Sequence, residues 1–158
     1  MAKDSLCKIL EFKSEFLECV TEIVHQTIEK NYFETYSLEV VEYFKDYHSP
    51  SHIDEKATKG FTLCLFVDEK LAGTGNLSGN EIGGVYIHPD YQGKGYGKLI
   101  IAELFKKAKS MDISKLYLDA TLCAYEFYLR FGFIEKKKVS QFIKNNAWLD
   151  YYEMEIVL

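Results

Sequence analysis

The chain of 158 residues has only two prolines, ten glycines and four cysteines, and it has no long apolar run. This composition lies within the ordinary range for a globular protein, so we expect neither a disordered chain nor a disulfide scaffold. Because the cysteines are far apart and form no C-x-x-C pair, we expect reduced thiols and a cytoplasmic protein. The longest apolar stretch is about half of the roughly 18 residues that a membrane-spanning segment needs, so we expect no membrane association.

Basic clusters and metal-ligand patterns are also scarce. The only lysine triplet, 136–138, is expected at a solvated hairpin edge, so we expect no nucleic-acid partner. No pair of the four histidines has the spacing of a metal site, so we expect no metal.

The charge that is present is distributed unevenly. Residues 1–90 carry 8 basic against 16 acidic residues, whereas residues 91–158 carry 11 against 8, within a formal net charge of −5. This asymmetry favours a cationic ligand near the first part and an anionic ligand near the second. Solvated faces without a ligand are the alternative interpretation.

Length and composition predict a single globular domain over residues 1–158. The sequence is 47% apolar and 27% charged, and no repeat or linker divides it. A chain of this length buries roughly 68 to 70% of its unfolded surface, which suffices without disulfides or a structural metal.

The apolar pattern of the first 60 residues is mainly helical. It predicts a short strand at 7–12, a helix capped by Ser14, a second helix from near Ser37 that buries Leu38, Val41 and Phe44, and a loop over 48–59.

From Phe61 the pattern changes to that of strands. We expect an antiparallel meander over 61–67, 71–77 and 81–88, with a bulge or a close backbone approach at Gly83 and Gly84. The meander is followed by a helix to about residue 110 and a strand at 115–120. After these we expect a short helix at 123–131, ended by a left-handed Gly132, and a final strand at 148–158. The strand, loop, helix, strand unit should pair its two strands in parallel.

The most informative stretch is the loop between the third meander strand and the next helix, in which Gly93, Gly95 and Gly97 alternate with other residues. Glycines at this spacing let several N–H groups converge, and the helix behind them adds the positive end of its dipole. The stretch therefore predicts a phosphate cradle. It fits neither the P-loop nor the dinucleotide pattern, which leaves the spacing Gln92-x-x-Gly95-x-Gly97.

This spacing, preceded by residues 85–89 (VYIHP), resembles the acyl-CoA-binding signature of the GNAT superfamily of N-acetyltransferases. Residues 118–133, with Phe127-Tyr128 and Phe131-Gly132-Phe133, resemble the family's later strand and helix, and residues 149–154 are similar to its final strand. The resemblance implies a mixed α/β fold: a mostly antiparallel central sheet of six to seven strands with a splayed parallel pair, and helices on both faces.

The same resemblance implies acetyl-CoA as co-substrate. Its pantetheine arm is expected along the backbone of Val85 and Ile87, and its pyrophosphate on N–H groups of the glycine loop with charge from Lys94 or Lys98. The expected cofactor-binding residues are Val85, Tyr86, Ile87, Gln92, Gly93, Lys94, Gly95, Tyr96, Gly97 and Lys98.

Two residues are expected to carry the chemistry. The resemblance assigns Tyr128 as the general acid that protonates the leaving thiolate, and Glu81 as the base, acting directly or through water, for an amine whose free pKa is about 10.4. The alternatives are a packed Tyr128 and an exposed strand-edge Glu81. The family's asparagine near the start of the short helix is not evident in Thr121-Leu122-Cys123.

The predicted reaction is direct acetyl transfer to a primary amine, either a small cationic amine or an amine of a peptide or protein. The resemblance places Tyr32 and Glu34 in the acceptor wall, beside the acidic surplus. The alternatives are a non-catalytic acyl-CoA-binding or sensing module and an unrelated protein with a phosphate-binding turn. The sequence leaves the oligomeric state open, with a homodimer among the options.

Overall fold

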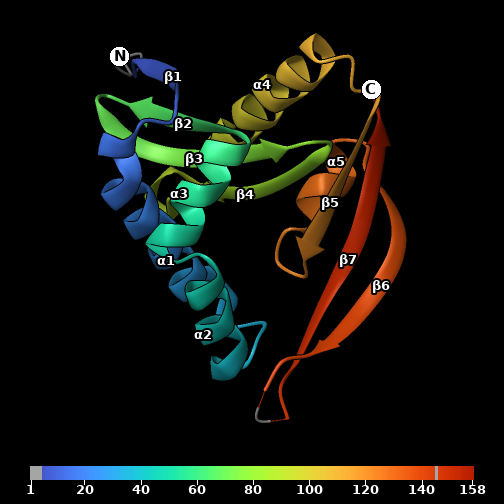
Figure 1. The fold of residues 1–158 in the computed structure, drawn as a ribbon. Helices are drawn as coiled ribbons and strands as arrows, with labels where there is room; N and C mark the ends of the chain where they lie inside the picture. The colour runs from blue at the N-terminus through green and yellow to red at the C-terminus, as the bar shows by residue number, and fades with distance from the viewer. Residues whose placement is uncertain (1–4, 145) are drawn as a thin grey trace.

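A seven-stranded mixed sheet with helices on both faces forms the protein (Figure 1). The computed structural model describes residues 5–144 and 146–158. The strand order is β1-β2-β3-β4-β5-β7-β6. All neighbouring strands are antiparallel except β4 and β5, which are parallel. This architecture confirms the predicted fold class.

The elements follow the predicted order, except that the sequence pattern gave no bounds for the strand at 134–142; other differences are described below. The strands are β1 (Cys7–Glu11), β2 (Phe61–Val67), β3 (Lys70–Ser78), β4 (Glu81–Ile87), β5 (Lys115–Thr121), β6 (Ile134–Phe142) and β7 (Trp148–Val157). The helices are α1 (Leu17–Tyr32), α2 (Leu38–Tyr47), α3 (Pro50–Lys59), α4 (Tyr96–Ser110) and α5 (Tyr125–Arg130), with 3₁₀ turns η1 (Ser14–Phe16) and η2 (Pro89–Tyr91).

Each face of the sheet has its own apolar cluster. On one face α4 packs on β3, where Gly73 and Gly75 allow a close approach: a Cβ on Gly75 would lie 2.6 Å from Ile100 Cγ2. On the other face α1 and α2 form a second cluster around Val20, Ile28 and Val41. The two helical layers hold β4 between them, so both faces of this strand are supported.

The parallel pair opens almost at once. β4 and β5 pair only through Glu81 and Tyr117, and β4 then leaves β5. The register between β3 and β4 shifts between Thr74 and Asn76, opposite the adjacent glycines, and Gly84 has a φ of +56°. The predicted bulge is therefore present, and bulges increase the local twist of a strand.

Three local expectations are wrong. Residues 50–59 form α3 rather than a loop, because Ser49 Oγ accepts a hydrogen bond from the His52 N–H and Pro50 occupies the first helical turn, where it needs no N–H partner. Ser14 begins a 3₁₀ turn and provides no side-chain cap. Leu38 is 55% exposed, and its neighbour Val40 is buried instead.

No helix in the described part of the chain combines the length and the apolar character needed to cross a membrane.

Leu104→Ala tests the α4 layer. The side chain of Leu104 is fully buried, so its truncation should lower the free energy of unfolding by about 2 to 5 kcal/mol in urea denaturation. Leu99 lies on the same helix and is 43% exposed, so Leu99→Ala should cost about 0.5 kcal/mol or less. Equal losses in the two variants would contradict this packing.

Candidate functional site

The loop before α4 has the backbone geometry of an anion site. Gly93 and Gly95 have φ values of +75° and +86°, and no atom lies within 4 Å of a Cβ built on either. Their left-handed conformation, rather than crowding, therefore favours glycine. Gly95 is the N-cap of α4, and no side chain caps the helix, so its first N–H groups are available to a diphosphate.

Side chains fix this loop relative to its surroundings. Gln92 Nε2 donates to the Ile87 carbonyl at 2.9 Å, and His88 Nδ1 accepts from the Asp90 N–H at 3.1 Å. His88 therefore organises the turn. A Cβ on Gly97 would lie 3.0 Å from Phe127 Cζ, which places the first turn of α4 against α5.

The edge of β4 that faces the gap has unpaired backbone groups. The His88 N–H donates to the Ala72 carbonyl of β3 at 2.8 Å. Because backbone groups alternate along a strand, Ile87 and Val85 direct theirs toward the other edge, where β5 has diverged. The Ile87 carbonyl already accepts from Gln92 and from Thr27 Oγ1, so the Ile87 N–H and the groups of Val85 remain for a ligand.

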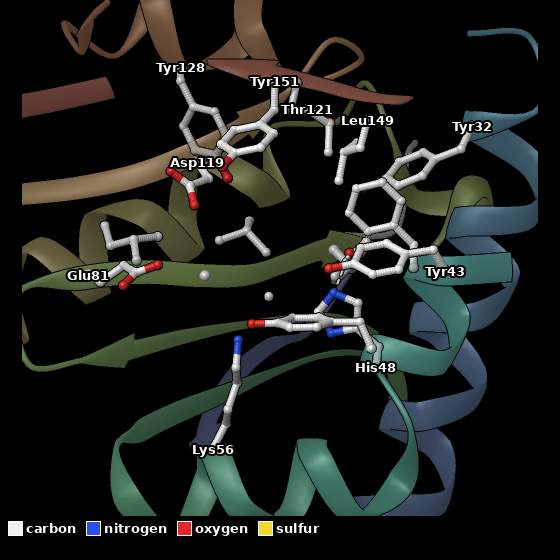
Figure 2. Close-up of a pocket in the computed structure, with 18 of the residues that line it drawn as sticks. Tyr32, Tyr43, His48, Lys56, Glu81, Asp119, Thr121, Tyr128, Leu149 and Tyr151 are labelled. Atoms are coloured by element: carbon white, nitrogen blue, oxygen red, sulfur yellow. Dashed lines mark hydrogen bonds between the residues drawn. The ribbon is translucent and has the colours of Figure 1, made fainter. Parts of the chain in front are cut away.

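A cavity of about 340 Å³ opens beside this edge (Figure 2). Its walls come from the helices α1, α2, α3 and α5 and from the strands β4, β5, β6 and β7. The lining side chains with polar groups are Tyr32, Tyr43, Tyr47, His48, Lys56, Glu81, Tyr86, Asp119, Thr121, Tyr128, Gln141 and Tyr151.

Tyr128 lies on α5 and lines the cavity with a nearly buried ring. Phe127 and Phe133 pack edge-on against the ring and fix its orientation. Burial raises the pKa of the Tyr128 phenol well above its usual value, so the group stays protonated at neutral pH. Its hydroxyl has no hydrogen-bond partner among the described residues, and it is a free donor toward the cavity.

Two carboxylates stand where β4 and β5 separate. Glu81 begins β4, and Asp119 follows its pairing partner Tyr117 by two residues on β5. Burial raises the pKa of Asp119, and the carboxylates of Glu81 and Glu153 raise it further. Asp119 lies directly opposite Glu153 on β7, so like charges are held side by side. A carboxylate with a raised pKa is a stronger base.

His48 and Tyr86 form a buried polar pair at one side of the cavity. The Tyr86 hydroxyl and His48 Nε2 are 2.9 Å apart, and His25 Nε2 lies 2.8 Å from the His48 carbonyl. Burial, followed by the charge of Lys56, lowers the pKa of His48 to about 3. His48 is therefore neutral at physiological pH, and the Tyr86 side chain is directed toward α2 rather than toward the glycine loop.

The structure places the predicted site residues in two regions, the cavity and the glycine loop, with one exception. Tyr128, Glu81, Val85, Tyr86 and Tyr32 line the cavity, and the residues of the glycine loop lie at the start of α4, beyond the end of β4. Lys94 Nζ lies 5.7 Å from the Tyr91 ring centroid, and Lys98 is exposed. Glu34 is exposed after α1 and does not line the cavity, so the structure does not bring it to the site.

Sequence reasoning gave no role in this site to His48, Lys56, Asp119 or Thr121. The Ser49-Pro50 pair is a helix-start signal that could have placed Lys56 on a helix. Asp119 shares a strand face with Tyr117, but only the tertiary fold shows that Glu81 meets this strand.

Comparison with known proteins identifies relatives. Residues 32–158 match the family model of an acetyltransferase (GNAT) domain. Glucosamine 6-phosphate N-acetyltransferase of Schizosaccharomyces pombe is 31% identical over 119 residues, which cover 70% of this chain and 94% of that protein. The uncharacterized N-acetyltransferase ycf52 of Gracilaria tenuistipitata var. liui is 42% identical over 50 residues, and this match spans only 28% of that protein and 32% of this chain.

Solved structures share the whole fold. A GCN5-related N-acetyltransferase from Rhodopseudomonas palustris is 25% identical, with a TM-score of 0.90 over 100% of this chain and 99% of that one. The PaiA N-acetyltransferase of Thermoplasma acidophilum, in complex with coenzyme A, is 21% identical with a TM-score of 0.79 over 97% of this chain and 99% of that chain. The second likeness shows the fold alone.

The pH dependence of stability tests the burial of His48. Below pH 6.5 the unfolded chain protonates this ring, whereas the folded protein does so only near pH 3. The stabilisation of the folded state by the neutral ring is therefore complete above pH 6.5 and is lost as pH falls toward 3. Between about pH 6 and 4, the free energy of unfolding should fall less steeply with decreasing pH in His48→Gln than in the wild type, the difference in slope being about 1.4 kcal/mol per pH unit. The same change at exposed His52 is the control, and equal slopes in all three proteins would refute the burial argument.

Gly95→Val tests the glycine loop. A β-branched residue resists the positive φ, so the variant should bind coenzyme A at least about tenfold more weakly in calorimetry, a change of about 1.4 kcal/mol. Gly79→Val introduces a comparable strain, at a φ of +58° in the β3–β4 turn, and should lower the melting temperature without changing affinity. Unaltered affinity in Gly95→Val would remove the loop from the ligand site.

Proposed function

The chain belongs to the GNAT family of acetyltransferases, and on this premise we propose that it transfers an acetyl group from acetyl-CoA directly to a primary amine. One observation carries the proposal: the unpaired edge of β4, the free Tyr128 hydroxyl and the carboxylates at the β4–β5 separation all border one cavity. The relative named glucosamine 6-phosphate N-acetyltransferase supports an amine acceptor.

The residues around the loop fit acetyl-CoA as co-substrate. The uncapped N–H groups at the start of α4 would bind its diphosphate, and Lys94 and Lys98 would add positive charge. The Ile87 N–H and the Val85 carbonyl would hold the pantetheine arm in extended form, which leaves the Val85 N–H for the reacting carbonyl. The diphosphate and the arm would then direct the thioester toward Tyr128.

The chain supplies the proton transfers of the reaction. Asp119, whose pKa is raised, and Glu81 would between them accept two protons: one that the ammonium form of the acceptor loses to free its lone pair, and one that the nitrogen loses as it bonds to the acetyl carbon. The Val85 N–H would stabilise the oxyanion. As the carbon–sulfur bond breaks, the Tyr128 hydroxyl would donate its proton to the thiolate, and exchange with solvent would restore the phenol.

An acyl-CoA-binding or sensing module without turnover is the competing proposal. Such a module needs the loop and the β4 edge, but it needs neither a free tyrosine donor nor a carboxylate beside the gap. The presence of both groups favours the enzyme. All four cysteines are free thiols, which supports the further proposal of a reducing, cytoplasmic setting.

Tyr128→Phe tests the reaction with an amine panel, acetyl-CoA and mass-spectrometric detection of products. The variant keeps the ring packing and loses only the proton donor, so kcat should fall by about 10²-fold or more while acetyl-CoA affinity changes less than about twofold. Tyr125→Phe, on the same helix but outside the cavity, is the matched control and should keep wild-type turnover. An unchanged kcat in Tyr128→Phe would remove this residue from the mechanism. If the wild type acetylates no amine of the panel, the competing proposal of a binding module is favoured.

A further inference from the structure

Lys56 places a positive charge on the wall of the cavity. It lies on α3, is partly buried, and directs its ammonium toward the cavity (Figure 2). Its Nζ is 4.8 Å from the centroid of the Tyr47 ring and 3.9 Å from the position that a Cβ on Gly83 would take. Because residue 83 is glycine, no side chain covers the ammonium from the β4 side.

Within the described residues, Lys56 has no carboxylate within ion-pair distance. Lys59, one turn later on the same helix, pairs with Glu55 and is exposed. The charge of Lys56 also contributes to the lowered pKa of His48, so it acts on the interior of the cavity. A lysine ammonium that faces a cavity and has no acidic partner is a candidate site for an anion.

The backbone under Lys56 is held firmly. Its carbonyl accepts hydrogen bonds from the Gly60 N–H at 2.9 Å and from Asn76 Nδ2 at 3.3 Å. Gly60 in turn lies so close to β3 that a Cβ there would be 2.5 Å from Ser78 Oγ. The end of α3 is therefore packed directly on the sheet, and the lysine extends from a fixed base.

The cavity consequently has two charged sides. Glu81 and Asp119 provide negative charge where β4 and β5 separate, and Lys56 provides positive charge from α3 (Figure 2). Thr121 and the phenol of Tyr32 line the space as well, and the buried Thr121 Oγ1 has no hydrogen-bond partner in the described part of the chain. A volume of about 340 Å³ suits a small molecule that bears both an amine and an anionic group.

We propose that the acceptor is a small primary amine that also carries a carboxylate or phosphate, and that Lys56 binds this anionic group as a specificity-determining residue. This inference rests on the proposed acetyl transfer and adds a class of acceptor to it. Lys56 holds the anion so that the amine at the other end of the molecule lies near the two carboxylates and Tyr128. The acidic surplus of residues 1–90 alone would suggest a purely cationic acceptor.

The test uses matched acceptors that differ only in the anion. Amino acids are compared with their amides, and aminoethyl phosphate with aminoethanol, so that carboxylate and phosphate are examined separately. Wild-type kcat/KM should be at least about tenfold higher for the anionic member of a pair, as expected for a charged hydrogen bond. Lys56→Gln should lose this preference through a higher KM, with kcat near wild type at saturation.

Two variants complete the experiment. Lys59→Gln removes the same charge from the same helix outside the cavity and should keep the wild-type preference. Lys56→Glu should reverse it, so that aminoethanol is used better than aminoethyl phosphate. Equal use of charged and neutral acceptors by the wild type, or a preference that survives Lys56→Gln, overturns the inference while acetyl transfer itself stands.

Binding separates this inference from the proposed function. If no amine is acetylated, the proposed function fails, and the melting temperature with each probe then judges the site. Stabilisation of the wild type by an amino acid or by aminoethyl phosphate, absent in Lys56→Gln and retained in Lys59→Gln, supports an anion site at Lys56. No stabilisation by any anionic probe overturns it.

Discussion

The separation of β4 from β5 after one bridging pair is the constraint on which the site depends. Had the parallel ladder continued past Glu81 and Tyr117, the outer backbone groups of β4 would be used within the sheet. The bulge at the adjacent glycines turns β4 away, and the helical layers on both faces support the unpaired strand. The resulting edge leads from the start of α4 to the carboxylates, so the proposed cofactor and acceptor regions meet there.

Most of the fold follows from local patterns in the chain. The β-rich run from Phe61 predicts the meander, and the crossover rule predicts the parallel pair from the order of the elements along the chain. The helix at 50–59 was not predicted, because a proline can end a helix as well as begin one. The Ser49 cap that begins this helix is a single hydrogen bond. That residues 1–158 form a single domain stays a prediction.

The two halves of the site differ in how well a sequence reveals them. The loop from Gln92 to Lys98 is one contiguous segment, and its glycines indicate directly where the backbone takes a positive φ. The acceptor side is assembled from distant segments: His48 meets Tyr86 across 38 positions, and Lys56 reaches the cavity because α3 docks on β3. Sequence periodicity does not predict such long-range contacts, so the sequence did not indicate that Lys56 lies at this site.

The carboxylates of Asp119 and Glu153, which lie opposite each other on β5 and β7, lower the stability of the sheet beside the site. Like charges directly across a strand pair weaken a sheet, and a threonine or lysine on β7 would relieve the repulsion. Replacing Glu153 with a neutral residue would remove this repulsion and, with it, one cause of the raised pKa of Asp119. Thermal endurance would thus be gained at the expense of basicity beside the gap.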